Sequence, residues 1–129
     1  MLSEADKQLY ARQILLRELG IAGQEQLCTT DVALAGEADP RCRAVAGEYL
    51  ERAGLRVEDA APGPALGAAR LLRLPASEDV ARLAGDPTLE GCAAWLLGSL
   101  AAVDAIKQVL GAGNQNPCTP AFVLAAEVR

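Results

Sequence analysis

Apolar residues near the start of the chain recur at helical spacing. Ser3, with Asp6 three residues later, has the form of a capping box, and Gly20 closes the apolar pattern. The pattern predicts one helix over residues 4–19 and a short second helix over residues 24–27. The apolar positions of the first helix are Leu9, Ile14, Leu16 and Leu19.

A strand, a turn and a helix are predicted next. Residues 31–36 form a compact β-like run that ends in glycine. Asp39 has the side chain of an N-cap, Pro40 suits the first helical position, and Gly54 ends the helix. Residues 55–58 then predict a second strand. The expected inner face of the helix consists of Cys42, Ala46, Tyr49, Leu50 and Ala53.

The middle of the chain continues this alternation. Residues 62–67, which are rich in proline and glycine, predict a loop, and residues 71–74 predict a short strand closed by Pro75. Ser77 begins a further helix, which we expect to run to about residue 83 because two acidic residues occupy its first turn.

One long helix is predicted over residues 89–110. It is apolar nearly all round, which is typical of a helix that is buried on most sides. Residues 121–125 then fit a terminal strand. These elements together predict an α/β fold in which helices flank a short, mainly parallel sheet of about four strands.

The length of 129 residues suits a single domain. Hydrophobic residues make up 51% of the chain but aromatic residues only 3%, so the core must consist mainly of Ala, Leu and Val. The domain has four parts, namely N-terminal helices over 1–30, a βα unit over 31–54, a middle over 58–88, and a late helix with the terminal strand over 89–129.

The formal net charge is −5, and the Lys and Arg residues are scattered. Sequence-independent binding to nucleic acid or anionic lipid requires basic patches, so neither partner is expected. The longest uncharged apolar stretch, residues 91–103, is shorter than the roughly 20 residues that span a bilayer, and the N-terminus does not resemble a signal peptide. We therefore expect a cytoplasmic protein with no membrane partner.

The cysteines are far apart in the sequence, and the chain has no histidine. Structural zinc sites normally use closely spaced pairs of ligands, so no metal site is expected. Reduced and mostly buried thiols are the simpler interpretation. The cysteines are Cys28, Cys42, Cys92 and Cys118.

Two stretches at opposite ends of the chain resemble a known family. Residues 10–24 read YARQILLRELGIAGQ, and residues 98–111 read GSLAAVDAIKQVLG. They resemble the N-terminal motif and the late helix of the ThiF/MoeB/HesA family, the bacterial relatives of ubiquitin-activating enzymes. VALAG at 32–36 and YLERAG at 49–54 also look like segments of that family. The resemblance implies a trimmed Rossmann-like domain from which the central catalytic portion is missing.

The resemblance places an ATP-binding loop after the first strand, where this chain reads AGEADPRC. Of the glycines that let the backbone approach phosphate, only Gly36 remains, and Arg41 stands at the position of the third. Glu37 and Asp39 would place carboxylates beside a polyphosphate, which they repel. Gly36 and Arg41 are thus candidates of a degenerate nucleotide loop. We expect no cofactor, with ATP and magnesium as the alternative.

Three arginines and two acidic residues are further candidate site residues. Arg41 and Arg43 either bind an anion or lie solvated in the first turn of their helix. Glu58 and Asp59 loosely match the place of the family's acidic cluster for ribose and magnesium. In the family, the position of Arg12 reaches across a dimer interface to the partner's phosphates, so Arg12 is a candidate catalytic residue acting in trans. Alternatively, Arg12 caps or salt-bridges within the N-terminal helix of a dimer.

Cys92 lies in the general region where some relatives carry an acceptor thiol. Its flanking residues differ from theirs, and the chain offers no histidine to activate it. We therefore expect Cys92 to be a small core residue. Trp95 and Phe122 are likewise expected to fill the core rather than to stack on a ligand.

The sequence thus indicates a retained scaffold with lost chemistry. We expect a catalytically inactive scaffold or regulatory protein that forms a homodimer and binds other proteins, with a full-length adenylating enzyme or a ubiquitin-like sulfur carrier as candidate partners. The alternative is ATP-dependent adenylation, by this chain alone or with Arg12 supplied to a partner subunit. A stable remnant with no specific ligand is the third hypothesis.

Overall fold

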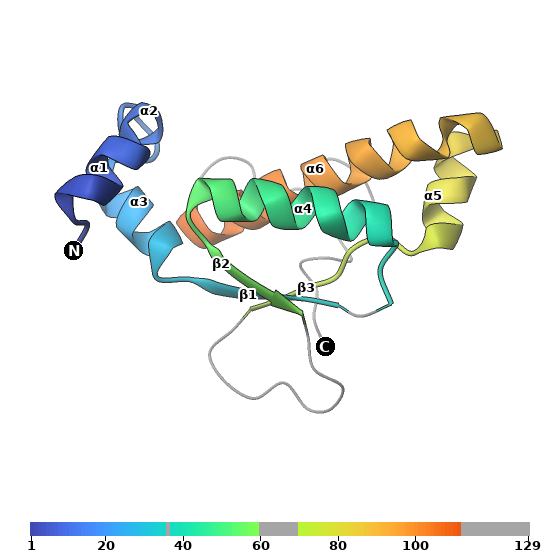
Figure 1. Ribbon diagram of the computed structural model, residues 1–129, viewed down its shortest axis with the longest axis horizontal. Helices are drawn as coiled ribbons and strands as arrows, with labels where there is room; N and C mark the ends of the chain where they lie inside the picture. Colours follow the sequence, from blue (N-terminus) through green and yellow to red (C-terminus); the bar gives the residue numbers. More distant parts are fainter. Residues whose placement is uncertain (36, 60–69, 112–129) are drawn as a thin grey trace.

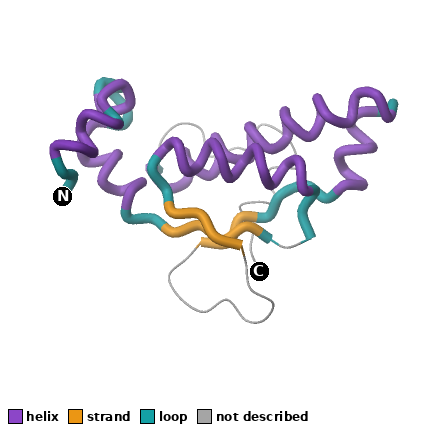
Figure 2. The backbone as a smooth tube through the Cα atoms, in the orientation of Figure 1, coloured by secondary structure: helices purple, strands orange, loops and turns teal. Residues whose placement is uncertain are grey.

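Three short parallel strands form the sheet of the computed structural model (Figure 2). The strand order is β2-β1-β3, so β1 is central. Val32 of β1 lies in register with Val57 of β2 on one side and Arg70 of β3 on the other. The strands are β1 (Asp31–Leu34), β2 (Arg56–Asp59) and β3 (Arg70–Leu72). The structure describes residues 1–35, 37–59 and 70–111.

Two long helices, α4 (Pro40–Ala53) and α6 (Glu90–Leu110), lie side by side over one face of the sheet (Figures 1 and 2). Val32 and Leu34 of β1 are buried in the core that these helices share, whereas Ala33 between them is only partly covered. The alternation places the core on one face of β1. The predicted small α/β class is therefore confirmed, with the described helices on one side of the sheet.

Local sequence signals set the ends of α4, as predicted. Asp39 is the N-cap, and its side chain accepts hydrogen bonds from the first turn, which begins at Pro40. At the other end Gly54 has φ 110°, and a Cβ there would lie 2.6 Å from Gln24 Nε2. The buried residues of α4 are Cys42, Ala46 and Leu50, whereas Tyr49 of the predicted face is 38% exposed.

The predicted single helix over residues 4–19 is wrong. The capping box is present, but the backbone at Tyr10 leaves helical geometry (φ −100°, ψ 18°). Leu15 and Leu16 are exposed, because the discontinuous apolar face supplies no single stripe whose packing would hold one helix. Gly20, with φ 62°, begins the last of three segments. These are α1 (Glu4–Leu9), α2 (Ala11–Ile14) and α3 (Gly20–Cys28), the last being longer than predicted.

The region from β3 to α6 largely follows the prediction. β3 begins one residue before the predicted strand over 71–74, and α5 (Ser77–Ala84) begins where expected. The helix η1 (Pro87–Leu89) then leads into α6. The predicted loop over 62–67 and the terminal strand over 121–125 lie outside the described residues, so the described sheet has three strands rather than four.

Helix α6 matches the prediction in extent but is not buried on most sides. A Cβ on Gly98 would lie 2.7 Å from the backbone oxygen of Cys42, so α6 and α4 approach closely there. The opposite face exposes Trp95 and Leu96 by 56% and 50%, because α3, α4 and α5 cover the other side. Inner-face residues are Ala93, Ala94, Leu97, Ala101 and Ala102.

By length and composition alone, the segment Pro87–Leu110 also meets the requirement for crossing a membrane, with a mean hydropathy of 1.4. The sequence prediction missed this because the helix extends beyond the uncharged residues 91–103. Core helices of soluble proteins pass the same test. In the described part of the chain α6 packs against α3, α4 and α5, which fits a core helix.

Candidate functional site

The candidate site lies where the carboxyl ends of β1 and β3 meet the N-terminus of α4. β1 is followed by α4 and then by β2 on one side of the sheet, whereas β3 pairs with β1 on the other side. In open α/β sheets, ligands bind at such a point, where the order of the strands reverses. A helix N-terminus there also offers free N–H groups to an anion.

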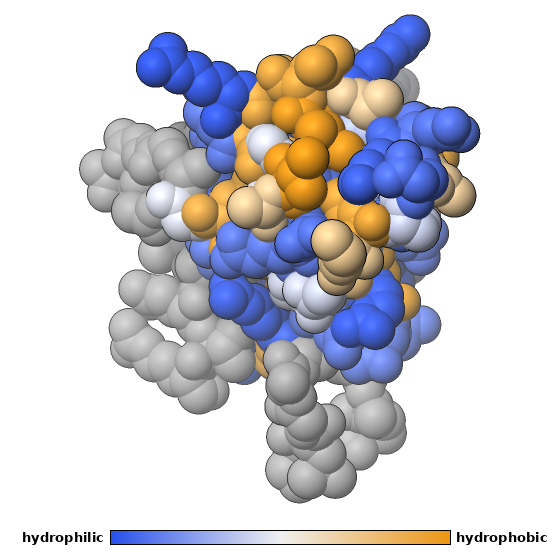
Figure 3. All heavy atoms as spheres, turned by 90° about the vertical axis from the view of Figure 1, so that its left-hand side faces the viewer, coloured by the Kyte–Doolittle hydropathy of each residue, from blue (hydrophilic) through white to orange (hydrophobic). Residues whose placement is uncertain are grey.

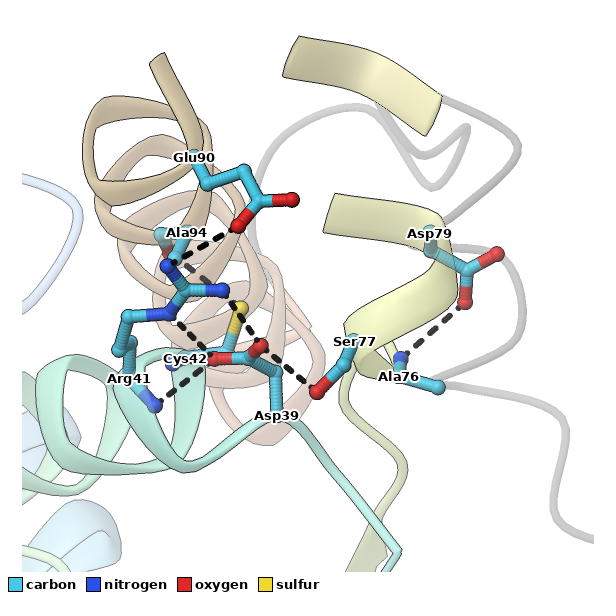
Figure 4. Close-up of polar contacts among 8 residues, drawn as sticks. All are labelled: Asp39, Arg41, Cys42, Ala76, Ser77, Asp79, Glu90 and Ala94. Atoms are coloured by element: carbon cyan, nitrogen blue, oxygen red, sulfur yellow. Dashed lines mark hydrogen bonds and ion pairs between the residues drawn. The ribbon is translucent and has the colours of Figure 1, made fainter. Parts of the chain in front are cut away.

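The carboxylate of Asp39 occupies this N-terminus. Its side chain is 1% exposed, and its Oδ1 accepts hydrogen bonds from the backbone N–H groups of Arg41 at 2.8 Å and Cys42 at 3.3 Å. The hydroxyl of Ser77 donates to Oδ2 at 2.9 Å. Figure 4 shows the carboxylate between α4 and the first turn of α5. The free donors of α4 therefore already have an anionic partner.

Arg41 closes the same cluster from the solvent side. Its guanidinium donates to both oxygens of Asp39, from Nε to Oδ1 at 3.2 Å and from Nη2 to Oδ2 at 3.0 Å, and Nη1 lies 3.7 Å from Glu90 Oε2 (Figure 4). This two-pronged contact is the strong form of a charge-assisted hydrogen bond. Arg41 is thus an exposed first-turn residue, with 46% of its side chain accessible, that pairs with two acidic side chains.

Hydrogen bonds to Asp39 favour its ionised form. The contact with Arg41 contributes most and lowers the pKa of Asp39 from 3.8 to about 2, against the opposing effect of burial. Ser77 and the two backbone N–H groups act in the same direction. Asp39 also donates its own N–H to Pro75 O at 2.9 Å. Asp39 thus ties the β3–α5 connection to α4.

Cys42 lies directly below this cluster and is fully buried. Burial, with the charge of Asp39 second, raises the pKa of the Cys42 thiol to about 11. Its Sγ donates to the carbonyl oxygen of Ala94 on α6 at 3.3 Å. The thiol therefore stays protonated near neutral pH and joins α4 to α6.

A second polar feature lies on the other side of α4, above β2. A groove of about 420 Å³ is lined by residues of β1, α4 and β2. Its one cationic residue, Arg43, lies 2.5 Å from Asp59 Oδ1 and also donates to the carbonyl of Ala35. The acidic lining residues are Glu48, Glu51, Glu58 and Asp59. The structure thus places the predicted pair Glu58 and Asp59 at the end of β2, in surroundings that repel phosphate.

The structure does not bring Arg12 to the site of its own chain. Arg12 is exposed on α2, and Gln13 Nε2 beside it donates to Arg52 O at the far end of α4. Figure 1 shows α2 at the end of α4 opposite to α5. Within the described residues Arg12 forms no ion pair, so its predicted salt bridge is absent there. Gly36 lies outside the described residues, and Glu37 is exposed.

Two expectations about core residues are corrected. Cys92 is exposed and Trp95 is 56% exposed, because both lie on the outer face of α6. Among the described thiols only Cys42 is fully buried, Cys28 being partly exposed; Cys118 and Phe122 lie outside the described residues. The described residues contain no group of three or more side chains suited to hold a metal ion.

Sequence reasoning identified Asp39 as a cap and Ser77 as a helix start but missed their contact. Glu90 was missed as a partner of Arg41. The only signal was that Asp39 and Ser77 each follow a predicted strand, since parallel strands end at one edge of a sheet.

Comparison with models of known protein families and with curated protein sequences found no match. Membership of the ThiF/MoeB/HesA family thus stays a prediction from the motifs.

Proposed function

We propose that this chain is a catalytically inactive, trimmed ThiF/MoeB-like scaffold or regulatory module that acts through dimerisation and protein–protein contacts. The supporting observation is the Asp39 carboxylate at the N-terminus of α4. It accepts the backbone hydrogen bonds that an incoming phosphate would need.

Electrostatics supports the same proposal. A phosphate about 4 Å from the Asp39 carboxylate would be repelled by about 4 kcal/mol at an effective dielectric constant of 20. The charge of Arg41 offsets part of this repulsion, but Arg41 could bind the phosphate directly only by giving up contacts with Asp39 and Glu90, its present partners. The second groove presents four carboxylates and one arginine that is already paired. Neither place favours a polyphosphate.

A second candidate function rests on Arg12. It is exposed and, within the described residues, takes part in no ion pair. A positive side chain without a partner is suited to complete the phosphate site of another subunit. The partner would be a full-length adenylating enzyme, with this chain supplying charge rather than a pocket.

Isothermal calorimetry with Mg-ATP and then AMP tests the leading proposal. No measurable heat is expected from the purified protein. A dissociation constant near micromolar would contradict the proposal that the chain is catalytically inactive. For Arg12, the adenylation rate of a co-expressed full-length relative is compared with the wild-type chain and with Arg12→Ala. A drop confined to the variant supports the second function, and an unchanged rate removes it.

A further inference from the structure

The α4–β2 groove, the space of about 420 Å³ above β2, has an apolar bottom and an acidic rim. Leu34 is buried and Val57 is partly buried, so these two side chains form the bottom. Ala44 and Gly47 on the α4 side are small, which leaves space open between the helix and the strand. The acidic lining residues are all exposed and lie around this bottom. A space of this size is in the range of ligand-binding pockets.

The rim carries an excess of negative charge. Each arginine beside the groove is already held by one carboxylate at 2.5 Å, in the pairs Arg43–Asp59 and Arg52–Glu48. The other two carboxylates, Glu51 and Glu58, take part in no ion pair among residues 1–35, 37–59 and 70–111. A cationic group that enters the groove is therefore attracted to it.

Strand β2 borders the groove and lies at an edge of the described sheet, below α4 (Figure 1). The N–H of Arg56 donates to Thr30 O at 3.1 Å, on the side of β1. Because the N–H and C=O groups of successive residues in a strand point to opposite sides, those of Val57 and Asp59 face away from β1. No described strand pairs with that side. It can therefore pair with the backbone of a further strand.

We infer that the α4–β2 groove binds an extended basic segment of a partner protein, which adds to the edge of β2 and places a lysine or arginine side chain beneath α4. The aliphatic part of that side chain covers Leu34 and Val57, and its cationic end reaches Glu51. A lysine or arginine side chain matches both the apolar bottom and the acidic rim. This inference rests on the protein contacts in the proposed function and names the class of partner.

The chain itself supplies little that fits this groove. Residues 60–69, which follow β2, contain no charged residue, and residues 112–129 contain one basic residue, Arg129. A segment with several basic residues therefore comes from another molecule. The net charge of −5 favours the approach of such a segment.

The opposite edge of the sheet repels the same segment. Arg70 begins β3 and Arg73 follows it, and both are exposed. The one arginine of β2, Arg56, is instead paired with Asp31 at 2.5 Å. Charge thus directs a basic strand to β2 rather than to β3.

The N-terminal end of the molecule also differs from the groove in chemistry. Figure 3 faces this end and shows apolar side chains gathered over it. Leu15 and Leu16 are exposed there, and the exposed Arg12 and Arg17 lie close to them in the sequence. A basic segment finds no comparable set of carboxylates among these residues, so it is expected to bind at the groove.

A fluorescein-labelled peptide in which lysine alternates with threonine tests the inference by fluorescence anisotropy with the full-length protein. Wild type is expected to bind it at about 0.15 M salt. Glu51→Lys should weaken binding about tenfold, because attraction is replaced by repulsion. A peptide with glutamate in place of lysine is expected not to bind. No binding by wild type, or equal binding of the two peptides, overturns the inference.

Glu78→Lys is the matched control, since it makes the same change of charge at an exposed glutamate of α5, which packs against α6 rather than β2. It should change the affinity by less than about twofold, because salt screens distant charges. Equal losses in Glu51→Lys and Glu78→Lys would show attraction to the whole molecule and overturn the site. Wild-type self-association that Glu51→Lys abolishes would identify a second copy as the occupant and overturn a separate partner.

Amide hydrogen exchange, followed by NMR, tests the pairing with β2. The peptide is expected to slow exchange at Val57 and Asp59, whose N–H groups face the open edge. Glu58, whose N–H faces β1, should change little. Unchanged exchange at Val57 with the peptide bound overturns the strand addition. Heat with Mg-ATP would refute the inactive function alone, whereas a failure of the peptide to bind would overturn only this inference.

Discussion

The N-terminus of α4 and the outer face of α6 differ in how many of their side chains and backbone groups find a partner within the chain. At the first, one buried carboxylate accepts hydrogen bonds from two backbone N–H groups, a hydroxyl and a guanidinium. At the second, large apolar side chains such as Trp95 and Leu96 remain about half exposed. The place where a nucleotide would be expected is closed, and the unsatisfied surface is apolar.

This difference separates two kinds of site. A polar site binds a ligand when donors or charges await a partner, and α4 leaves none of its first-turn donors waiting near Asp39. An apolar surface binds when water covers area that another surface can cover. By that criterion the exposed face of α6 suits the protein contact that we propose better than the N-terminus of α4 suits a phosphate.

Asp39→Ala is expected to have the largest effect. It removes the N-cap of α4 and leaves the Ser77 hydroxyl and the Arg41 guanidinium without their anion, which together should lower the free energy of unfolding by about 3 kcal/mol. Urea denaturation measures the loss. Glu37→Ala, an exposed neighbour, is the control and should change stability by less than about 0.5 kcal/mol. Equal effects of the two substitutions would contradict the closed site.

Lowering the pH should weaken the hydrogen bonds around Asp39 and so reduce the free energy of unfolding. Folding lowers the pKa of Asp39 from 3.8 to about 2, so the stabilisation is complete above pH 4 and is lost as the pH falls towards 2. The shift corresponds to about 2 kcal/mol. Unfolding free energies of wild type and Asp39→Asn are compared between pH 5 and pH 2. Their difference should shrink on acidification; a constant difference would show that ionised Asp39 contributes nothing.

The two faces of α6 should respond differently to one added or removed atom. Gly98→Ala places a Cβ 2.7 Å from the backbone oxygen of Cys42, so α4 and α6 must separate. We expect a net loss of about 1 kcal/mol, since the gain in helix propensity offsets part of the strain. Ser99→Ala on the outer face should be neutral or slightly stabilising. Thermal unfolding of both variants checks this, and a stabilised Gly98→Ala would refute the close approach.

Sequence reasoning succeeded where a signal lies within a few residues of its effect. The N-cap Asp39 and the C-terminal Gly54 fixed α4, and the length of α6 followed from its apolar run. It failed over residues 4–19, where apolar residues at roughly helical spacing face solvent in separate short segments. Helical spacing alone does not tell whether a partner is present to cover the stripe.

The sequence by itself determined α4, α6, the approximate places of the three described strands and the identity of Asp39 as a cap, because capping and periodicity act through neighbouring residues. Only the tertiary structure decided that Asp39 meets Ser77, 38 residues away, because that contact requires β3 to pair beside β1. It also decided which face of α6 points outward. Residues 89–110 are apolar nearly all round, so only the packing of α6 against α3, α4 and α5 distinguishes the inner face from the outer one.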